Sequence, residues 1–129
     1  MQISVADTSF TGKVIQRIDL NFETTQVCVK DIITARVTHE VEAYNRRQDR
    51  YFQGLVMPAE AEQILNGYRL KSKQPIDAEK QVYIALQAFQ QGAYFVLVDD
   101  IQVEHLEETL ELTPNTQISF IKLTPLVGG

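Results

Sequence analysis

The residue types that most often carry catalysis are scarce in this chain. It contains one cysteine, Cys28, and two histidines, His39 and His105. A nucleophilic cysteine needs a neighbouring base, but His39 lies about three helical turns beyond Cys28 and so does not adjoin it on a helix. We interpret Cys28 as a buried, unreactive thiol, and we expect neither a catalytic residue nor an enzyme activity.

Metal ligands are equally scarce. One cysteine and two distant histidines cannot supply the four ligands of a structural zinc site. The acidic residues near the C-terminal end form the densest charge cluster, but their spacing does not match the calcium-binding loop of an EF-hand. We interpret them as a solvated acidic face or as an electrostatic patch for a basic partner, and we expect no metal and no cofactor. These residues are Asp99, Asp100, Glu104, Glu107, Glu108 and Glu111.

Charge and hydropathy exclude two further classes of partner. The net charge is −5 and the pI is about 5.0, whereas a nucleic-acid surface needs clustered basic residues. No apolar run approaches the ~20 residues that span a bilayer, and the first residues lack the basic and apolar regions of a signal peptide. We therefore expect a cytoplasmic protein that binds neither nucleic acid nor a membrane.

The stretch with the most distinctive chemistry is FIKLTPLVGG, residues 120–129, in which Gly128 and Gly129 follow a strand-like segment. A glycine acyl carbon has no Cβ beside it, so a nucleophile can approach it freely and the backbone can pass through a narrow channel. These properties suit a carboxylate that is activated as an acyl adenylate and then as a thioester. We expect Gly129, with Gly128 beside it, to carry the chemistry of this chain as a substrate and not as a catalyst.

The first elements that would position this terminus are a hairpin and a helix. Residues 1–7 and 14–22 alternate apolar and polar side chains around a turn that contains Gly12, which predicts a β-hairpin. Residues 24–47 carry apolar side chains every three or four positions, which predicts one long helix.

Residues 48–92 are predicted to form a helical insertion. Pro58 and Gly67 bracket a short helix, and the next few residues are typical of a short exposed strand. Asp77 then caps a second helix over 78–91, which Gly92 closes.

The remaining residues predict strands. The run 93–98 is continuously β-rich, which is typical of a strand buried on both faces. A short strand begins at Ile101, and a turn at 113–116 precedes the last strand, 117–123. A hairpin, a long helix and a late strand that returns to the sheet are the order of a β-grasp. The predicted fold is therefore α+β, with the helical insertion between the main helix and the middle strand.

Several of these features resemble ubiquitin in sequence and in position. The chain begins MQISV, has TGK (11–13) at its first turn, and carries a strand followed by Gly-Gly. The segment VLVDDIQVEHLEETLEL (96–112) is also similar to the middle strand, turn, short strand and following loop of ubiquitin. The resemblance covers residues 1–40 and 93–129 of a single ubiquitin-like domain, with 48–92 as the insertion and 124–129 as a C-terminal tail.

The final residues also resemble bacterial ubiquitin-like proteins that are encoded beside activating enzymes, conjugating enzymes and JAB-type deconjugating proteases. This resemblance implies a protein modifier with those three partners, whose Gly129 is adenylated, passed to an enzyme cysteine and joined to an amine or hydroxyl of target proteins. Ubiquitin has arginines in its tail, whereas this tail has none. A dedicated activating enzyme that binds Pro125, Leu126 and Val127 is therefore implied.

Two alternatives to a modifier stay open. The first is a sulfur carrier that also ends in Gly-Gly and forms a thiocarboxylate, although such carriers are usually shorter and lack a helical insertion. The second is a non-covalent β-grasp interaction or assembly subunit in which the two glycines are incidental. Self-association, with the uncharged tail on a neighbouring copy, also stays open.

A surface for partners is a separate prediction. Phe10, at the tip of the hairpin, forms a candidate apolar patch with Val96, Val98 and Ile121. The alternative is that most of these side chains belong to the core.

Overall fold

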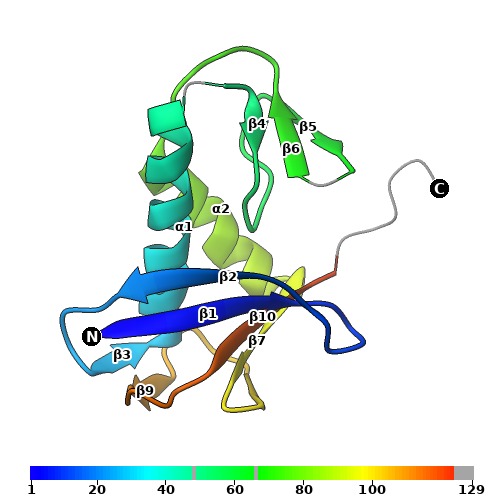
Figure 1. The fold of residues 1–129 in the computed structure, drawn as a ribbon. Coiled ribbons are helices and arrows are strands. Elements are labelled where there is room, and N and C mark those ends of the chain that lie inside the picture. Colours follow the sequence, from blue (N-terminus) through cyan, green and yellow to red (C-terminus); the bar gives the residue numbers. More distant parts are fainter. Residues whose placement is uncertain (48, 66, 124–129) are drawn as a thin grey trace.

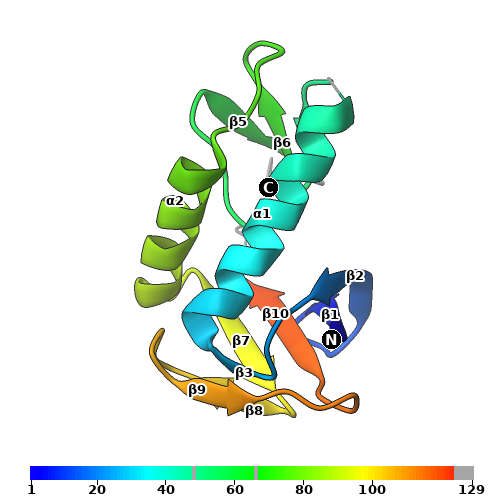
Figure 2. The same cartoon turned by 90° about the vertical axis from the view of Figure 1, so that its left-hand side faces the viewer.

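The computed structural model describes residues 1–47, 49–65 and 67–123. Within these residues, a mixed five-stranded sheet has the strand order β2-β1-β10-β7-β8. Helices α1 and α2 lie together on one side of it (Figure 1, Figure 2). This architecture is compatible with the predicted α+β class. The elements are β1 (Gln2–Thr8), β2 (Val14–Asn21), β10 (Ile118–Lys122), β7 (Tyr94–Val98), β8 (Ile101–Val103), α1 (Val29–Arg47) and α2 (Ala78–Gln90).

The last strand of the sheet lies beside the first. β1 runs parallel to β10 and antiparallel to β2, while β7 runs antiparallel to both β10 and β8. The predicted hairpin is confirmed, with an irregularity between Asp7 and Thr8. Gly12 has a φ of 88° in its turn, a left-handed value that glycine adopts without a steric penalty.

The long helix begins later than its sequence pattern predicts. Residues 26–28 form strand β3 (Gln26–Cys28), which pairs with β9 (Thr109–Glu111), and α1 begins only at Val29. Asp31 caps this start, because its Oδ2 accepts a hydrogen bond from the amide of Cys28. The predicted start at residue 24 is wrong because the β-branched residues before Val29 favour extended backbone and find a partner in β9.

The insertion contains a small antiparallel sheet as well as a helix. Between Pro58 and Gly67, where the sequence predicts a short helix, the chain forms a hairpin. Glu60 (φ 56°) and Gly67 (φ 151°) take positive values that a right-handed helix excludes. A segment of this length is also too short to hold a helix by itself, and the buried Tyr68 packs instead beside Phe52. The sheet has the order β4-β6-β5, with β4 (Tyr51–Phe52), β5 (Ala61–Ile64) and β6 (Gly67–Leu70).

The second predicted helix is confirmed. The Asp77 side chain accepts a hydrogen bond from the Lys80 amide at the start of α2, and the helix ends at Gln90. The hydroxyl of Tyr94 on β7 donates to the carbonyl of Ala85 at 2.6 Å, which anchors α2 over the sheet. None of the helices in the described residues has both the length and the apolar composition that crossing a bilayer would require.

A buried ionic cluster connects α1 to the sheet. Arg36 of α1 is 0% exposed, and its guanidinium donates two hydrogen bonds to the carboxylate of Asp7 on β1, the one from Nη2 being 2.7 Å long. Its Nε donates to Oε1 of Glu40, one helical turn later, at 2.8 Å. The ring of Phe120 on β10 lies 4.6 Å from the Arg36 Cζ. One side chain therefore contacts α1, β1 and β10 together.

Two further groups complete this cluster. Gln16 of β2 donates to Asp7 Oδ2 at 2.7 Å, and the amide of Leu55 in the insertion donates to Glu40 Oε2 at 2.9 Å. Burial raises the pKa of the Glu40 carboxyl, while Arg36 and the Leu55 amide act in the opposite direction. Both carboxylates depend on Arg36 for a counter-charge, so the cluster is sensitive to the loss of that one residue.

We expect Arg36→Met to reduce the free energy of unfolding by about 3–5 kcal/mol, because it leaves two buried carboxylates without a counter-charge. The exposed Arg46 of the same helix provides a matched control, and Arg46→Met should change stability by less than about 0.5 kcal/mol. Urea denaturation of both variants measures the difference. Equal losses of unfolding free energy in the two variants would show that the buried cluster does not stabilise the fold in this way.

Candidate functional site

The end of β10 leads into the predicted reactive tail, and two contacts hold it. The amide of Leu123 donates to the carbonyl of Ala93, which continues the pairing with the start of β7. The Nζ of Lys122 donates to the carbonyl of Gly54 at 2.9 Å and lies 5.3 Å from the centroid of the Tyr68 ring. The insertion therefore binds the last strand at the point where the tail begins.

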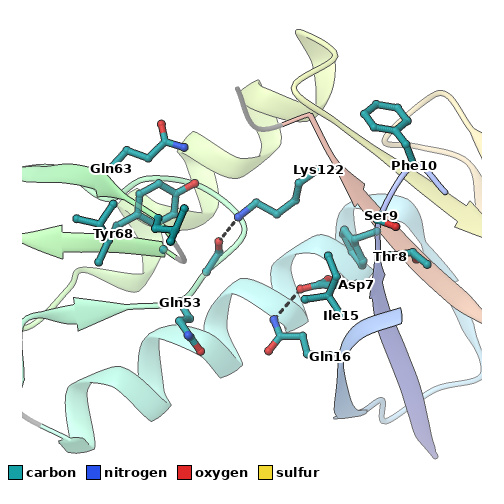
Figure 3. Close-up of a pocket in the computed structure, with 15 residues that line it drawn as sticks. Asp7, Thr8, Ser9, Phe10, Ile15, Gln16, Gln53, Gln63, Tyr68 and Lys122 are labelled. Carbon is teal, nitrogen blue, oxygen red and sulfur yellow. Dashed lines mark hydrogen bonds between the residues drawn. The ribbon is translucent and has the colours of Figure 1, made fainter. Parts of the chain in front are cut away.

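A cleft of about 580 Å³ opens beside Lys122, between the first hairpin and the insertion. We call it the hairpin–insertion cleft. Figure 3 shows the side chains of the hairpin on one side, those of the insertion on the other, and Lys122 between them. The described residues that line it are Asp7, Thr8, Ser9, Phe10, Ile15, Gln16, Gln53, Gly54, Gln63, Ile64, Leu65, Gly67, Tyr68, Phe120 and Lys122.

The described lining of the hairpin–insertion cleft combines an apolar mouth with polar side chains deeper in. The described lining residues include no cysteine and no histidine, and the carboxylate of Asp7 is already paired with Arg36. Its mouth is apolar and solvent-exposed, because Phe10 is 72%, Ile15 67% and Leu65 80% exposed. A cleft with this lining can hold an uncharged, apolar segment of chain.

The amine of Lys122 differs from an ordinary surface lysine. Burial lowers its pKa from the usual 10.5, and the positive charge of Arg36 acts in the same direction. The nearby carboxylates of Glu40 and Asp7 oppose this shift. The amine is therefore held by packing on Tyr68 and by the Gly54 carbonyl, and its partial removal from water disfavours the charged form.

The predicted reacting terminus, Gly128 and Gly129, and the predicted enzyme-binding residues, Pro125, Leu126 and Val127, lie outside the described residues. What the structure describes is the strand that carries them and the surface beside it.

The predicted partner patch is wrong for Val96, and Val98 is only partly exposed. Val96 is 0% exposed and Val98 packs against the core, because both lie on the inner face of β7 with the buried Tyr94. The outer face of β7 carries Phe95 and Leu97 instead, since alternate residues of a strand point to opposite faces. Tyr94 and Val96 on the inner face of β7 are buried and Phe95 and Leu97 on the outer face are half-buried, so the strand is not buried on both faces as predicted.

The other two residues of the patch lie toward solvent. Phe10 is exposed, and Ile121 is half-buried and paired across the sheet with Phe95. Phe10, Leu97 and Ile121 line one shallow hollow on the outer face of the sheet. A corrected apolar patch therefore consists of Phe10, Phe95, Leu97 and Ile121.

Several of the clustered acidic residues hold local structure. Oε2 of Glu108 accepts hydrogen bonds from the amides of His105 and Glu104, which lowers the pKa of the Glu108 carboxyl. Asp99 accepts from the Gln117 amide, and Glu111 from the Thr25 hydroxyl. Among the described residues, no group of three or more histidine, cysteine or acidic side chains is placed to hold a metal ion.

The ionic cluster was not predicted from the sequence, although the pairing of Arg36 with Glu40 could have been. Positions 36 and 40 are in phase with the apolar stripe of α1, so charged residues there predict a buried i,i+4 pair. Asp7 gives no comparable signal, because it meets Arg36 only through the fold. The sequence gives no signal for the cleft either. The insertion residues that line it belong to a small sheet, whereas the sequence predicts a helix there.

Comparison of this chain with protein-family models, with curated proteins and with solved structures found no match. Any assignment of function therefore rests on the residues and contacts of the chain itself.

The lowered pKa of Lys122 predicts a pH-dependent stability. Between that lowered pKa and 10.5, the unfolded chain binds more protons than the folded chain, so the free energy of unfolding rises with pH. From about pH 8 to about pH 10, we expect the wild-type chain to gain stability relative to Lys122→Met. Urea denaturation of both chains measures this, and a difference that stays constant or shrinks as the pH rises contradicts it.

Proposed function

We propose that this chain is a ubiquitin-like protein modifier that is joined to target proteins through Gly129. The observation that carries the proposal is the strand order β2-β1-β10-β7-β8, in which β10 lies parallel to β1 and runs on toward the Gly-Gly pair. A hairpin, a helix across the sheet and a last strand beside the first are the arrangement of a β-grasp. We assign the chain to that fold as part of the proposal.

The chemistry follows from the glycine terminus. The Gly129 carboxylate attacks the α-phosphate of ATP, pyrophosphate leaves, and an acyl adenylate forms. A cysteine thiolate of the activating enzyme then displaces AMP to give a thioester, and a target amine or hydroxyl displaces the thiol. Because neither Gly128 nor Gly129 has a side chain, each of these groups can reach the acyl carbon along a narrow channel.

The uncharged tail supports a dedicated set of enzymes. Thr124, Pro125, Leu126 and Val127 carry no charge, so an activating enzyme that recognises arginines would gain nothing from them. Its own activating enzyme would present an apolar groove to Leu126 and Val127, while Pro125 limits the conformations that the tail has to lose. A conjugating enzyme and a JAB-type protease complete the set, and we place the pathway in the cytoplasm.

The proposal predicts a recognisable remnant on target proteins. Trypsin cleaves after Lys122, and residues 123–129 contain no further lysine or arginine. A digested target should therefore carry Leu-Thr-Pro-Leu-Val-Gly-Gly as a branch on the modified side chain. Mass spectrometry of digests from cells that make the chain naturally should find such branched peptides.

Two variants sharpen this test. Deletion of Gly128 and Gly129 should abolish the branched peptides, whereas Ser72→Ala, in an exposed loop, should leave them unchanged. Intact-mass measurement distinguishes the alternatives. Replacement of one terminal oxygen by sulfur would indicate a sulfur carrier. Unmodified chain with no branched peptide would indicate a non-covalent subunit, and either result overturns the proposal.

A further inference from the structure

The mouth of the hairpin–insertion cleft carries three exposed apolar side chains. Phe10 and Ile15 from the hairpin and Leu65 from the insertion are each more than two-thirds exposed (72%, 67% and 80%), and among the described residues nothing covers them. Figure 3 shows Phe10 and Ile15 on the hairpin side of the cleft, and Tyr68, Gln53 and Gln63 on the insertion side. Three large apolar side chains around one opening form a surface on which an apolar segment can pack.

The chain itself brings a suitable segment to this opening. Lys122 lines the cleft, and Leu123 is fixed to Ala93, so residue 124 starts within one residue of the lining. Six residues in extended form reach about 20 Å, which is enough to cross a cleft of about 580 Å³.

The charge of the segment also fits the cleft. Residues 124–127 are Thr-Pro-Leu-Val and carry no charge. Among the described lining residues, Lys122 is the cationic side chain, and the carboxylate of Asp7 is already paired with Arg36. Leu126 and Val127 can pack on the apolar mouth without bringing a second charge beside Lys122.

We propose that residues 124–127 bind the hairpin–insertion cleft of their own chain. The tether makes weak contacts sufficient, because a short linker gives an effective concentration on the order of 1 mM. A cleft that bound the free segment with a Kd of about 0.1 mM would then be about 90% occupied. Docking covers the apolar mouth and holds the Gly-Gly pair near the insertion.

A regulatory consequence follows, and it rests on the proposed function. An activating enzyme would bind only the undocked form, so its apparent affinity would fall in proportion to the undocked fraction. Docking itself requires no enzyme, and it can be tested in the isolated chain whether or not conjugation occurs.

The test places a nitroxide spin label on Gly129→Cys in the full-length chain, with Cys28→Ser so that the label has one site. NMR signal intensities of the backbone amides of Gln53, Leu65 and Tyr68 report proximity to the label. We expect these amides to lose most of their intensity, while Leu110 and Val103, on β9 and β8, keep theirs. Uniformly small effects at the cleft would overturn the proposal.

Two controls define the contact. Leu65→Asp should restore the intensities at Gln53 and Tyr68, because a charge enters the apolar mouth. Ile101→Asp replaces an equally exposed apolar residue (70%) on β8, outside the cleft, and should restore nothing. If both variants act alike, the tail does not recognise the cleft.

A mixed sample separates docking within one chain from docking between copies. Spin-labelled chain without isotope is added to isotope-labelled chain without a spin label. Full intensities in the mixture support docking within the chain. Loss of cleft intensities in the mixture would assign the cleft to the tail of a second copy and overturn the proposal.

Discussion

The guanidinium of Arg36 is the contact on which the arrangement of sheet, helix and insertion depends. It holds Asp7 of the first strand and Glu40 of its own helix, and it lies over Phe120 of the last strand. Glu40 in turn accepts the Leu55 amide of the insertion. A buried ion pair adds little net stability compared with apolar packing, but a shift that separated its partners would leave a charge buried and unpaired. The cluster therefore penalises any other placement of the insertion relative to the sheet.

Sequence patterns identified the elements whose periodicity is long and regular. The hairpin, most of α1, all but the last residue of the second helix and the last strand followed from alternation, apolar spacing and an Asp77 cap. The three-residue strands β3 and β9 were missed because each is too short to show a period and needs its partner to form. In the insertion, the residues of β6 were predicted to form an exposed strand, whereas Tyr68 and Leu70 are buried, and β4 and β5 were missed. The residues of β5 are helix-compatible locally, and the small sheet is held by packing of Phe52 and Tyr68 with Tyr44 of α1.

The exposed face of β7 and the hairpin–insertion cleft also depend on contacts between segments that are distant in sequence. A β-rich run does not reveal which of its two faces is inward, so Val96 was a candidate both for the core and for the surface, and the structure places it in the core. The neighbouring register fixes it, since Phe120 and Val96 are paired and both are fully buried. The hairpin–insertion cleft depends on elements far apart in sequence, so it emerges only when β6 is folded against the end of β10. The proposal of a reactive glycine terminus needs no tertiary structure, because it depends only on the absence of side chains at Gly128 and Gly129.

If copies of this chain are joined to one another through the proposed chemistry, the placement of Lys122 bears on which amines can accept them. Its amine is bonded to Gly54 and packed over Tyr68, so its acylation would require both contacts to break. The remaining lysines, Lys13, Lys30, Lys71, Lys73 and Lys80, are all exposed. Lys13 belongs to the hairpin turn, Lys30 to the start of α1, and the other three to the insertion and the start of α2. Polymers built through any of these positions would differ in geometry, and none would branch at the base of the tail.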